Sequence, residues 1–374
     1  MLLLALAVCQ PATAARKPTT PAVYKVPTKI PDDCSVPVEA KIMAWLATVP
    51  DGSSIQFGPG RCYGQDGTIT LTGRSGLVID GQGSEFRALT PGGSHRANWR
   101  LVRGGSLTLA NMAVRGSNPQ GSYDPAVEWQ HGYAVEGVQG ATLSNIQARD
   151  TWGDGVFLWR GASSPACGDD ASSARNVVIS GALIERSGRQ GVAVVDAENV
   201  TLQDSTIGPV AWWAVDLETD DNCGIARHIS ILRNTFGATR YGAIGSVGFG
   251  GDPQVGDVTV ADNTQTVEAG LPGECWAPVW ILSPEAMYRT GYVFRGNRFL
   301  ARRNAFEFRR VRNIDVSSNN VTLTPTTGCG TRAGVLLVDS HTVGITSNAF
   351  SGANTVFKTD TLSTGITSTG NTTN

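Results

Sequence analysis

The sequence predicts an all-β protein folded as one single-stranded parallel β-helix with an N-terminal capping helix. Two observations predict this class: a short motif of alternating apolar residues recurs along the chain, and a second apolar segment follows many of its copies at a nearly constant distance. Composition agrees, since 45 of the 374 residues are glycine, as expected of a protein with many turns. The formal net charge of -2 gives no electrostatic support for a nucleic-acid partner.

The N-terminal residues are typical of an exported protein. We predict a secretory signal peptide at residues 1–14, because Leu2-Leu-Leu-Ala-Leu-Ala-Val8 is apolar but too short to span a membrane, and Ala12-Thr-Ala14 resembles a cleavage signal. Residues 15–31 contain four prolines and are expected to form an extended linker. The β-helix domain then covers residues 32–374. We therefore expect a secreted monomer without a membrane span.

The capping helix is predicted at the start of this domain. Val38, Ile42, Trp45 and Leu46 recur at helical spacing, which places their side chains on one face of a short amphipathic helix. No other segment gives a comparable helical pattern. The helix therefore covers the first coil, and strands form the rest.

The recurring motif has an apolar residue at its first and third positions, then small or polar residues, and often an asparagine. Eleven copies start at gaps of 22 to 36 residues. Because no helical segment separates them, this period indicates a parallel β-helix with one motif in each coil. We expect the aligned asparagines to form a hydrogen-bonded ladder inside the solenoid. They are Asn234, Asn263, Asn297, Asn319 and Asn348.

A second strand follows the first in each coil. In four consecutive coils it opens 13 or 14 residues after the motif begins, and this constancy fixes which residues stack. Asp216 is expected above Ala193 and Phe157. Glu218 is expected above Val195 and Trp159. Neighbouring coils would be about 4.8 Å apart.

The cysteines indicate disulfides. Apart from Cys9, which supports a weaker lipoprotein alternative, six remain, and an even number in an exported chain favours pairing. Two lie in loops after the second strand and two lie in long connections before it, in each case two coils apart. The last two lie at the N-terminal cap. The predicted pairs are Cys167 with Cys223, Cys275 with Cys329, and Cys34 with Cys62.

Three segments resemble the entry coils of bacterial right-handed parallel β-helix proteins of the pectin-lyase-like superfamily. They are Trp45-Leu-Ala-Thr-Val-Pro-Asp-Gly-Ser53, Asp66-Gly-Thr-Ile-Thr-Leu71 and Leu77-Val-Ile-Asp-Gly-Gln-Gly83. The resemblance implies a pectin-lyase-like solenoid of right-handed coils over residues 36 to 374. That superfamily includes polysaccharide lyases, glycoside hydrolases, epimerases and phage tailspikes.

A further segment, Trp152-Gly-Asp-Gly-Val156, is similar to the Asn-Thr-Asp-Gly-Ile element that carries a catalytic aspartate in polygalacturonases. Only Asp154 matches that role. Where those enzymes have a pair of aspartates on the next coil, this chain has Arg189-Gln190. Their Gly-His-Gly and Arg-Ile-Lys motifs are absent from the sequence. A turn formed by Asp154 and Gly155 is the structural alternative for this aspartate.

The segment Val215-Asp216-Leu217-Glu218 alternates apolar and acidic residues, so both carboxylates are expected to point outward on one strand face. We predict Asp216 and Glu218, with Asp154, as the catalytic acid and base or nucleophile of glycoside hydrolysis. A solvated strand face is one alternative. A Ca²⁺ site that includes Asp220 and Asp221 is another.

Tryptophans gather near the same face, and seven of the nine are assigned to the second strand or its adjoining loops. Because tryptophan stacks on sugar rings, this distribution favours a carbohydrate ligand. Arginines there would neutralise an acidic sugar or act as a base, and a histidine would carry a proton or serve only structure. The predicted substrate-binding residues are Trp159, Trp212, Trp213, Trp280, Arg189, Arg309, Glu307 and His131.

These features favour a secreted carbohydrate-active enzyme, a glycoside hydrolase that cleaves a polysaccharide along a carboxylate- and tryptophan-lined face. Two alternatives remain open: a polysaccharide lyase on an acidic glycan, and a non-catalytic glycan-binding surface protein. The expected partner is a polysaccharide or a cell-surface glycan. No cofactor is required by this chemistry, and Ca²⁺ is the one ion that the carboxylates suggest.

Overall fold

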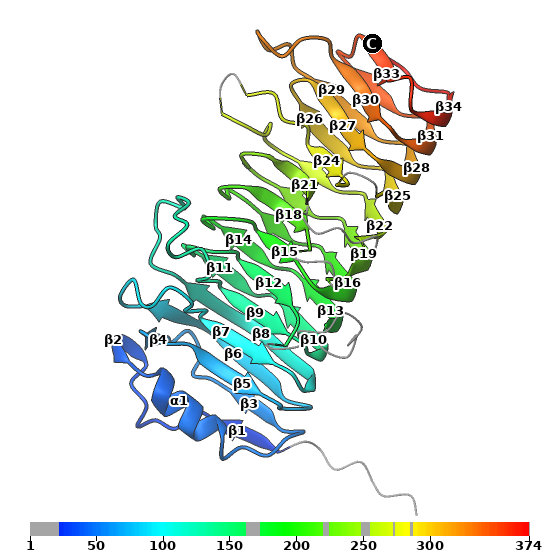
Figure 1. Ribbon diagram of the computed structural model, residues 1–374. Helices are drawn as coiled ribbons and strands as arrows, with labels where there is room; N and C mark the ends of the chain where they lie inside the picture. The colour runs from blue at the N-terminus through cyan, green and yellow to red at the C-terminus, as the bar shows by residue number, and fades with distance from the viewer. Residues whose placement is uncertain are drawn as a thin grey trace, which may run out of the picture.

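The computed structural model describes residues 22–161, 173–219, 224–247, 255–271, 274–284 and 287–373. The chain winds into an elongated right-handed parallel β-helix with the first coils at one end and the C-terminus at the other (Figure 1). Its strands form two sheets of 11 and 23 strands, and the strand pairs are parallel. The eleven predicted copies of the motif belong to the larger sheet, and ten of the eleven strands of the smaller sheet each follow one of them; the strand Ile69–Thr72 precedes them all. The predicted fold is therefore confirmed.

We call the smaller sheet the front sheet, because it carries the candidate site. Each coil contributes one strand to it, and neighbours in the sheet are successive coils. Its strands are β5 (Ile69–Thr72), β7 (Trp99–Val102), β9 (Tyr133–Glu136), β12 (Val156–Trp159), β15 (Val192–Val194), β18 (Trp213–Leu217), β21 (Gly242–Val247), β24 (Val279–Leu282), β27 (Asn304–Arg309), β30 (Ala333–Val338) and β33 (Thr355–Thr359).

The larger sheet, the rear sheet, bends at a corner into two columns of strands. Long strands β6 (Val78–Ala88) and β8 (Gly105–Arg115) run through both columns. The first column adds β1 (Val23–Lys25), β3 (Ser54–Gln56), β10 (Gln139–Ser144), β13 (Ala174–Ser180), β16 (Ala197–Gln203), β19 (Ala226–Leu232), β22 (Val255–Ala261), β25 (Arg289–Arg295), β28 (Val311–Ser317), β31 (His341–Thr346) and β34 (Thr364–Thr369). The second adds β2 (Asp33–Pro37), β4 (Cys62–Gln65), β11 (Gln147–Arg149), β14 (Leu183–Glu185), β17 (Thr206–Ile207), β20 (Thr235–Phe236), β23 (Thr264–Gln265), β26 (Arg298–Ala301), β29 (Asn320–Leu323) and β32 (Ala349–Ser351).

The corner of the rear sheet contains the predicted asparagine ladder, which is confirmed. Asn297 shows the pattern: its Oδ1 accepts the backbone N–H and the Nδ2–H of Asn263, both at 3.0 Å, and its Nδ2 donates to the Val260 carbonyl at 2.8 Å. Asn371 extends the ladder by one coil. The residue before each ladder asparagine has a positive φ, at the corner between the two columns of strands. These residues are Arg233, Asp262, Gly296, Ser318 and Ser347.

The N-terminal end is closed by the predicted helix. Helix α1 (Glu39–Leu46) buries Ile42 and Leu46 against the first coils. Strand β1 pairs with β3, so residues 23–25 of the predicted linker belong to the rear sheet, and the solenoid begins earlier than expected. The pairing requires only backbone groups, which explains why the proline-rich sequence did not indicate it. The predicted signal peptide lies outside the described residues.

Two of the three predicted disulfides are present in the described part of the chain. Cys34 pairs with Cys62 across the first coils, and Cys275 pairs with Cys329 two coils apart. The third predicted pair, Cys167 with Cys223, lies outside the described residues. Within those residues, no helix is long and apolar enough to cross a membrane.

Candidate functional site

The outer face of the front sheet is formed by every second residue of its strands. The predicted stacking at its centre is confirmed: Asp216 of β18 lies beside Ala193 of β15, which in turn lies beside Phe157 of β12. On the other side, Asp216 pairs in register with Gly245, and Gly245 with Trp280. Small residues therefore flank Asp216 on both sides, and larger rings begin one coil further away. We call this surface the site face.

Asp216 points to the site face but is covered, with 3% of its surface exposed, so the alternative of a solvated strand face does not hold for Asp216. Its Oδ2 accepts a hydrogen bond from Gln190 Nε2 at 3.0 Å, whereas its Oδ1 is buried without a partner among the described residues. Burial raises the pKa of Asp216 to about 6, although Gln190 and nearby Arg189 oppose the shift. Asp216 thus holds a proton at mildly acidic pH.

One cover of this region is the indole of Trp213. Gly245 permits it: a β-carbon at this position would lie 2.5 Å from the Trp213 ring. The ring is therefore packed flat on the strand next to Asp216, and it is itself buried. A residue with a side chain could not replace Gly245 without moving this ring. The predicted residue Trp213 therefore lies on the site face.

Asp154 lies in the turn that enters β12 and is fully buried. Its Oδ1 accepts the backbone N–H of Gln190 at 3.0 Å, and its Oδ2 lies 3.2 Å from His131 Nδ1. Burial favours the neutral acid, but the positive charge of Arg189 and the neighbouring His131 hold the pKa of Asp154 below its usual value. Gln190 therefore bonds both aspartates, one through its backbone and one through its side chain.

Arg189 lies close to three carboxylates. Its guanidinium nitrogens lie 3.5 Å from Glu218, 3.6 Å from Glu128 and 3.8 Å from Asp154. Burial disfavours the charged form, but these carboxylates raise the pKa of Arg189 above its usual value. The guanidinium also lies 5.3 Å from the centre of the Trp212 ring. We call the four acids around this arginine, Glu128, Asp154, Asp216 and Glu218, the carboxylate cluster.

An aromatic group lies on the N-terminal side of the carboxylate cluster. The His131 and Phe157 rings are stacked with centroids 4.2 Å apart, and Trp129 and Trp159 each lie about 6 Å from Phe157. His131 connects this group to the acids through Asp154. We call His95, Trp129, His131, Phe157 and Trp159 the N-terminal aromatic group.

A second aromatic group lies on the C-terminal side. Tyr241 lies 5.9 Å from both Trp212 and Trp213 and 4.9 Å from Trp276, while Trp276 lies 5.4 Å from Trp280. We call Trp212, Trp213, Tyr241, Trp276 and Trp280 the C-terminal aromatic group. The carboxylate cluster therefore lies between two sets of aromatic rings on one face.

The remaining predicted residues, Glu307 and Arg309, lie further along the site face. Glu307 pairs in register with Trp280, and Arg309 Nη2 lies 2.6 Å from Glu307 Oε1. The structure thus brings all predicted site residues to one face, but only some of them to its centre. Among the described residues, no three or more His, Cys, Asp or Glu side chains are placed so that they could hold one metal ion. Asp220 and Asp221 of the Ca²⁺ alternative lie outside the described residues.

Sequence reasoning missed Glu128 and the bridging role of Gln190. Glu128 belongs to an irregular segment between β8 and β9, so no strand period could place it beside Arg189. Gln190 was noted only as a departure from the polygalacturonase pattern. The register could have identified it, because Gln190 lies one coil after Asp154 and one coil before the coil of β18, which carries Asp216.

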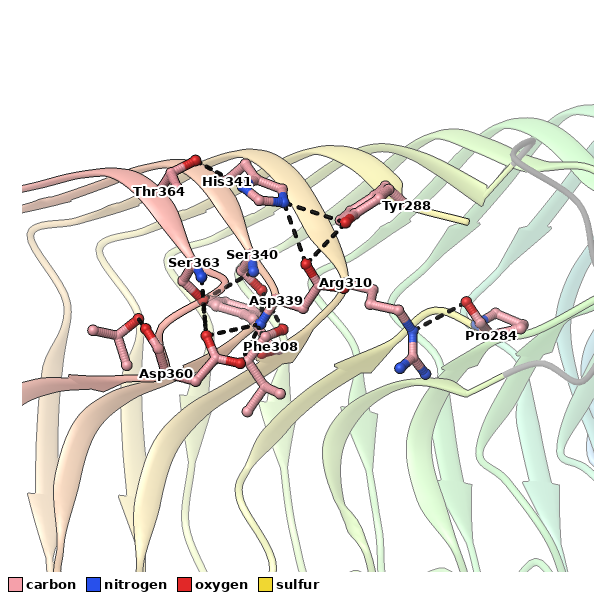
Figure 2. A network of polar contacts seen from close by, with 12 residues as sticks. Pro284, Tyr288, Phe308, Arg310, Asp339, Ser340, His341, Asp360, Ser363 and Thr364 are labelled. Carbon is pink, nitrogen blue, oxygen red and sulfur yellow. Dashed lines mark hydrogen bonds and ion pairs between the residues drawn. The ribbon is translucent and has the colours of Figure 1, made fainter. Parts of the chain in front are cut away.

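A second polar network lies in the C-terminal coils, as Figure 2 shows. The Tyr288 hydroxyl donates to Asp339 Oδ1 at 2.9 Å and lies 3.2 Å from His341 Nε2. Asp360 accepts hydrogen bonds from the backbone N–H of Asp339 and from Ser363. We call these residues the C-terminal network. It joins neighbouring coils and lies apart from both aromatic groups.

Comparison with known proteins identifies the fold. No family model and no curated protein matches the sequence. The surface adhesin PfbA of Streptococcus pneumoniae is similar in structure, with a TM-score of 0.61 at 10% identity over 91% of this chain and 92% of that chain. The A-module of the mannuronan C-5 epimerase AlgE6 of Azotobacter vinelandii has a TM-score of 0.61 at 12% identity over 93% and 99%.

A family 28 exopolygalacturonase of Yersinia enterocolitica has a TM-score of 0.59 at 9% identity, covering 94% of this chain and 78% of that chain. These identities are low, so the likeness concerns the fold. The chain has the pectin-lyase-like parallel β-helix fold. Its structural neighbours include carbohydrate-active enzymes and an adhesin, and chemistry differs among proteins of one fold.

Proposed function

We propose that this protein is a secreted glycoside hydrolase in which Asp216 donates a proton to the glycosidic oxygen. The observation that carries the proposal is the state of Asp216: it is buried on the site face, its pKa is raised to about 6, and its Oδ1 has no partner among the described residues. A general acid needs a pKa near the working pH and a proton that it can give away. Two disulfides fit an oxidising compartment outside the cytosol.

Glu218 is the second carboxylate in this proposal. It follows Asp216 by two residues, so the two Cα atoms are about 6.6 Å apart along an extended chain. Its side chain is 14% exposed, which makes it more accessible than Asp216. Glu218 then acts as the base for an attacking water or as the nucleophile, since both mechanisms use a pair of carboxyls at about 5 to 9.5 Å.

Asp154 has a positioning role. Its two oxygens both face groups of the protein, because Oδ1 accepts the Gln190 backbone N–H and Oδ2 lies 3.2 Å from His131 Nδ1. It holds the Gln190 backbone, whose side chain binds Asp216, and it shares Arg189 with Glu218. The pKa of Asp154 is lowered while that of Asp216 is raised, and such a divergence is typical of acid–base pairs in active sites.

Binding without catalysis is the second candidate. One observation favours it: Asp216 and Asp154 are both nearly inaccessible, whereas several tryptophans of the two aromatic groups are partly exposed. A structural neighbour named as a surface adhesin has the same fold. A lyase acting on an acidic glycan is a third reading, in which Arg189 would remove the proton. The carboxylates that raise the pKa of Arg189 disfavour that role.

The test is a polysaccharide panel assayed for new reducing ends and for the ultraviolet absorbance of an unsaturated product. Wild type should release reducing ends without that absorbance. Asp216→Asn and Glu218→Gln should each lower the rate by about 100-fold or more. Glu198→Gln is the matched control, because Glu198 is a largely buried carboxylate on the rear sheet, bonded to Arg227. It should retain wild-type turnover per folded molecule.

Two outcomes would overturn the proposal. Unsaturated products would identify a lyase. Binding of a glycan with no turnover by wild type on any member of the panel would favour the non-catalytic alternative.

A further inference from the structure

The N-terminal aromatic group surrounds a hollow of about 210 Å³ on the site face. Partly exposed Trp129 and Trp159 form its walls together with His95, and the buried residues Ala97, Ala134 and Phe157 form its floor. These small and aromatic side chains form an apolar cluster on the outside of the solenoid, separate from the main core. An apolar hollow with aromatic walls on an outer surface indicates a ligand.

Polar groups also line the hollow. Arg100 and Glu136 form a paired contact at its edge, with Nε and Nη2 of the arginine 2.7 and 2.6 Å from the two carboxylate oxygens. His131 Nε2 is buried and has no partner among the described residues. Sugar hydroxyls can complete the hydrogen bonding of such groups, because each hydroxyl both donates and accepts. The hollow thus offers aromatic rings on which a pyranose can stack and polar groups to which its hydroxyls can bond.

Three arginines of the site face are paired with acids of the protein before any ligand binds. Arg100 is paired with Glu136, Arg240 with Glu274 at 3.2 Å, and Arg309 with Glu307 at 2.6 Å. None of these three arginines is an unengaged cation for a carboxylate of the substrate. A uronic acid would therefore have to break an ion pair within the protein in order to gain one.

The carboxylate cluster adds an excess of negative charge at the centre of the site face. It places four acids around Arg189, and His131 joins it beside Asp154. Even with Asp216 protonated, the three carboxylates of Glu128, Asp154 and Glu218 exceed the two guanidinium groups that act on the cluster, those of Arg189 and of buried Arg289. The centre of the site is thus negative, and an acidic glycan bound across it would meet like charges that are close and poorly screened.

We propose that the hollow is a subsite for an uncharged sugar ring and that the polysaccharide is therefore neutral. The inference that the polysaccharide is the substrate of a hydrolase rests on the proposed function. The inference that a neutral sugar binds in the hollow does not. The ring lies against Trp129 and Trp159, whose centroids are 6.3 Å apart and whose planes are tilted by 53°, and its hydroxyls bond to His131 Nε2 and to the Arg100–Glu136 pair. His131 links the hollow to Asp154, so the bound ring lies next to the carboxylate cluster along the same chain of sugars. Arg189 organises acids and does not bind a substrate carboxylate.

The experiment is affinity gel electrophoresis of the full chain carrying Asp216→Asn, so that binding is measured without turnover. The gels contain either neutral polymers (mixed-linkage β-glucan, soluble α-glucan, mannan, unsubstituted xylan) or acidic polymers (polygalacturonate, alginate, hyaluronate). At least one neutral polymer should retard the protein, and the acidic polymers should retard it at least tenfold less. Adding Trp159→Ala should weaken the neutral retardation about tenfold.

The matched control is Trp45→Ala, since Trp45 is a partly buried indole on α1, away from the site face. It should leave retardation unchanged in molecules that remain folded by circular dichroism. Preferential binding of an acidic polymer, no retardation by any neutral polymer, or equal effects of the two tryptophan substitutions would overturn the inference. Turnover of an acidic polymer would overturn it while leaving a hydrolase in place. Binding of a neutral polymer that wild type does not cleave would support the neutral subsite and contradict the proposed hydrolase.

Discussion

The carboxylate cluster and the C-terminal network are both polar groups that join neighbouring coils, yet they differ in how completely their hydrogen bonds are satisfied. In the C-terminal network Tyr288, Asp339 and His341 have partners within the network (Figure 2). Around the carboxylate cluster, Asp216 Oδ1, Gln190 Oε1 and His131 Nε2 are buried without a partner among the described residues. Burying an unpartnered polar atom costs about 1–3 kcal/mol.

The difference indicates what each region is for. A network whose members bond one another across coils holds those coils together. Unpartnered buried atoms gathered beside aromatic rings are satisfied when a polar ligand binds, so the cost in the free protein is consistent with a binding site. The pKa values show the same contrast. The pKa of Asp216 is raised and that of Asp154 is lowered, whereas Asp360 of the C-terminal network has a lowered pKa: burial raises it, but hydrogen bonds from Ser363 and from backbone N–H groups together lower it more.

The largest effect is expected from Arg189→Met. The substitution leaves Glu218, Glu128 and buried Asp154 without their shared cation, and such a loss costs about 3–5 kcal/mol. Urea denaturation at neutral pH measures it. Because Arg189 lowers the pKa of Asp154, the lost stability should be partly regained at acidic pH. A loss below about 1 kcal/mol would show that the cluster is hydrated and weakly coupled.

The second-largest effect concerns how the free energy of unfolding depends on pH, which should have opposite signs for Asp216 in the carboxylate cluster and Asp360 in the C-terminal network. The folded pKa of Asp216 is about 6, above its ordinary value of 3.8, so the stability from its bound proton is complete below pH 3.8 and is lost as pH rises through 6. Wild type should lose on the order of 3 kcal/mol relative to Asp216→Asn across this window. For Asp360, whose pKa is lowered, the contribution is present above 3.8 and is lost as pH falls.

Stability measured at several pH values for wild type, Asp216→Asn and Asp360→Asn tests both signs. If the difference in stability from wild type changes with pH in the same direction for Asp216→Asn and Asp360→Asn, the two regions do not differ as described.

The smallest effect is expected from Tyr288→Phe. It removes one hydroxyl that donates to Asp339, so the free energy of unfolding should fall by about 1 kcal/mol. Glycan turnover should not change, since the residue lies outside the carboxylate cluster. A change in turnover after this substitution would mean that the C-terminal network has a functional role as well.

Sequence alone predicted the parts of the molecule that depend on periodicity. The ladder asparagines and the stacking of Asp216 on Ala193 follow from the constant offset between strands, and the structure has both. It could not predict that the Trp213 ring lies across Gly245, the register neighbour of Asp216, because a contact between coils leaves no periodic signal. For the same reason Glu128, in an irregular segment, was not associated with Arg189.

The most direct test of Asp216 as proton donor compares two substrates of the Asp216→Asn variant. One is the neutral polysaccharide that wild type cleaves, and the other is the dinitrophenyl glycoside of the same sugar, whose leaving group needs no proton. The variant should lose about 100-fold or more in kcat on the polysaccharide and less than about tenfold on the glycoside. On the polysaccharide, wild-type activity should also fall as pH rises through about 6. Equal losses on the two substrates would contradict the assignment of Asp216.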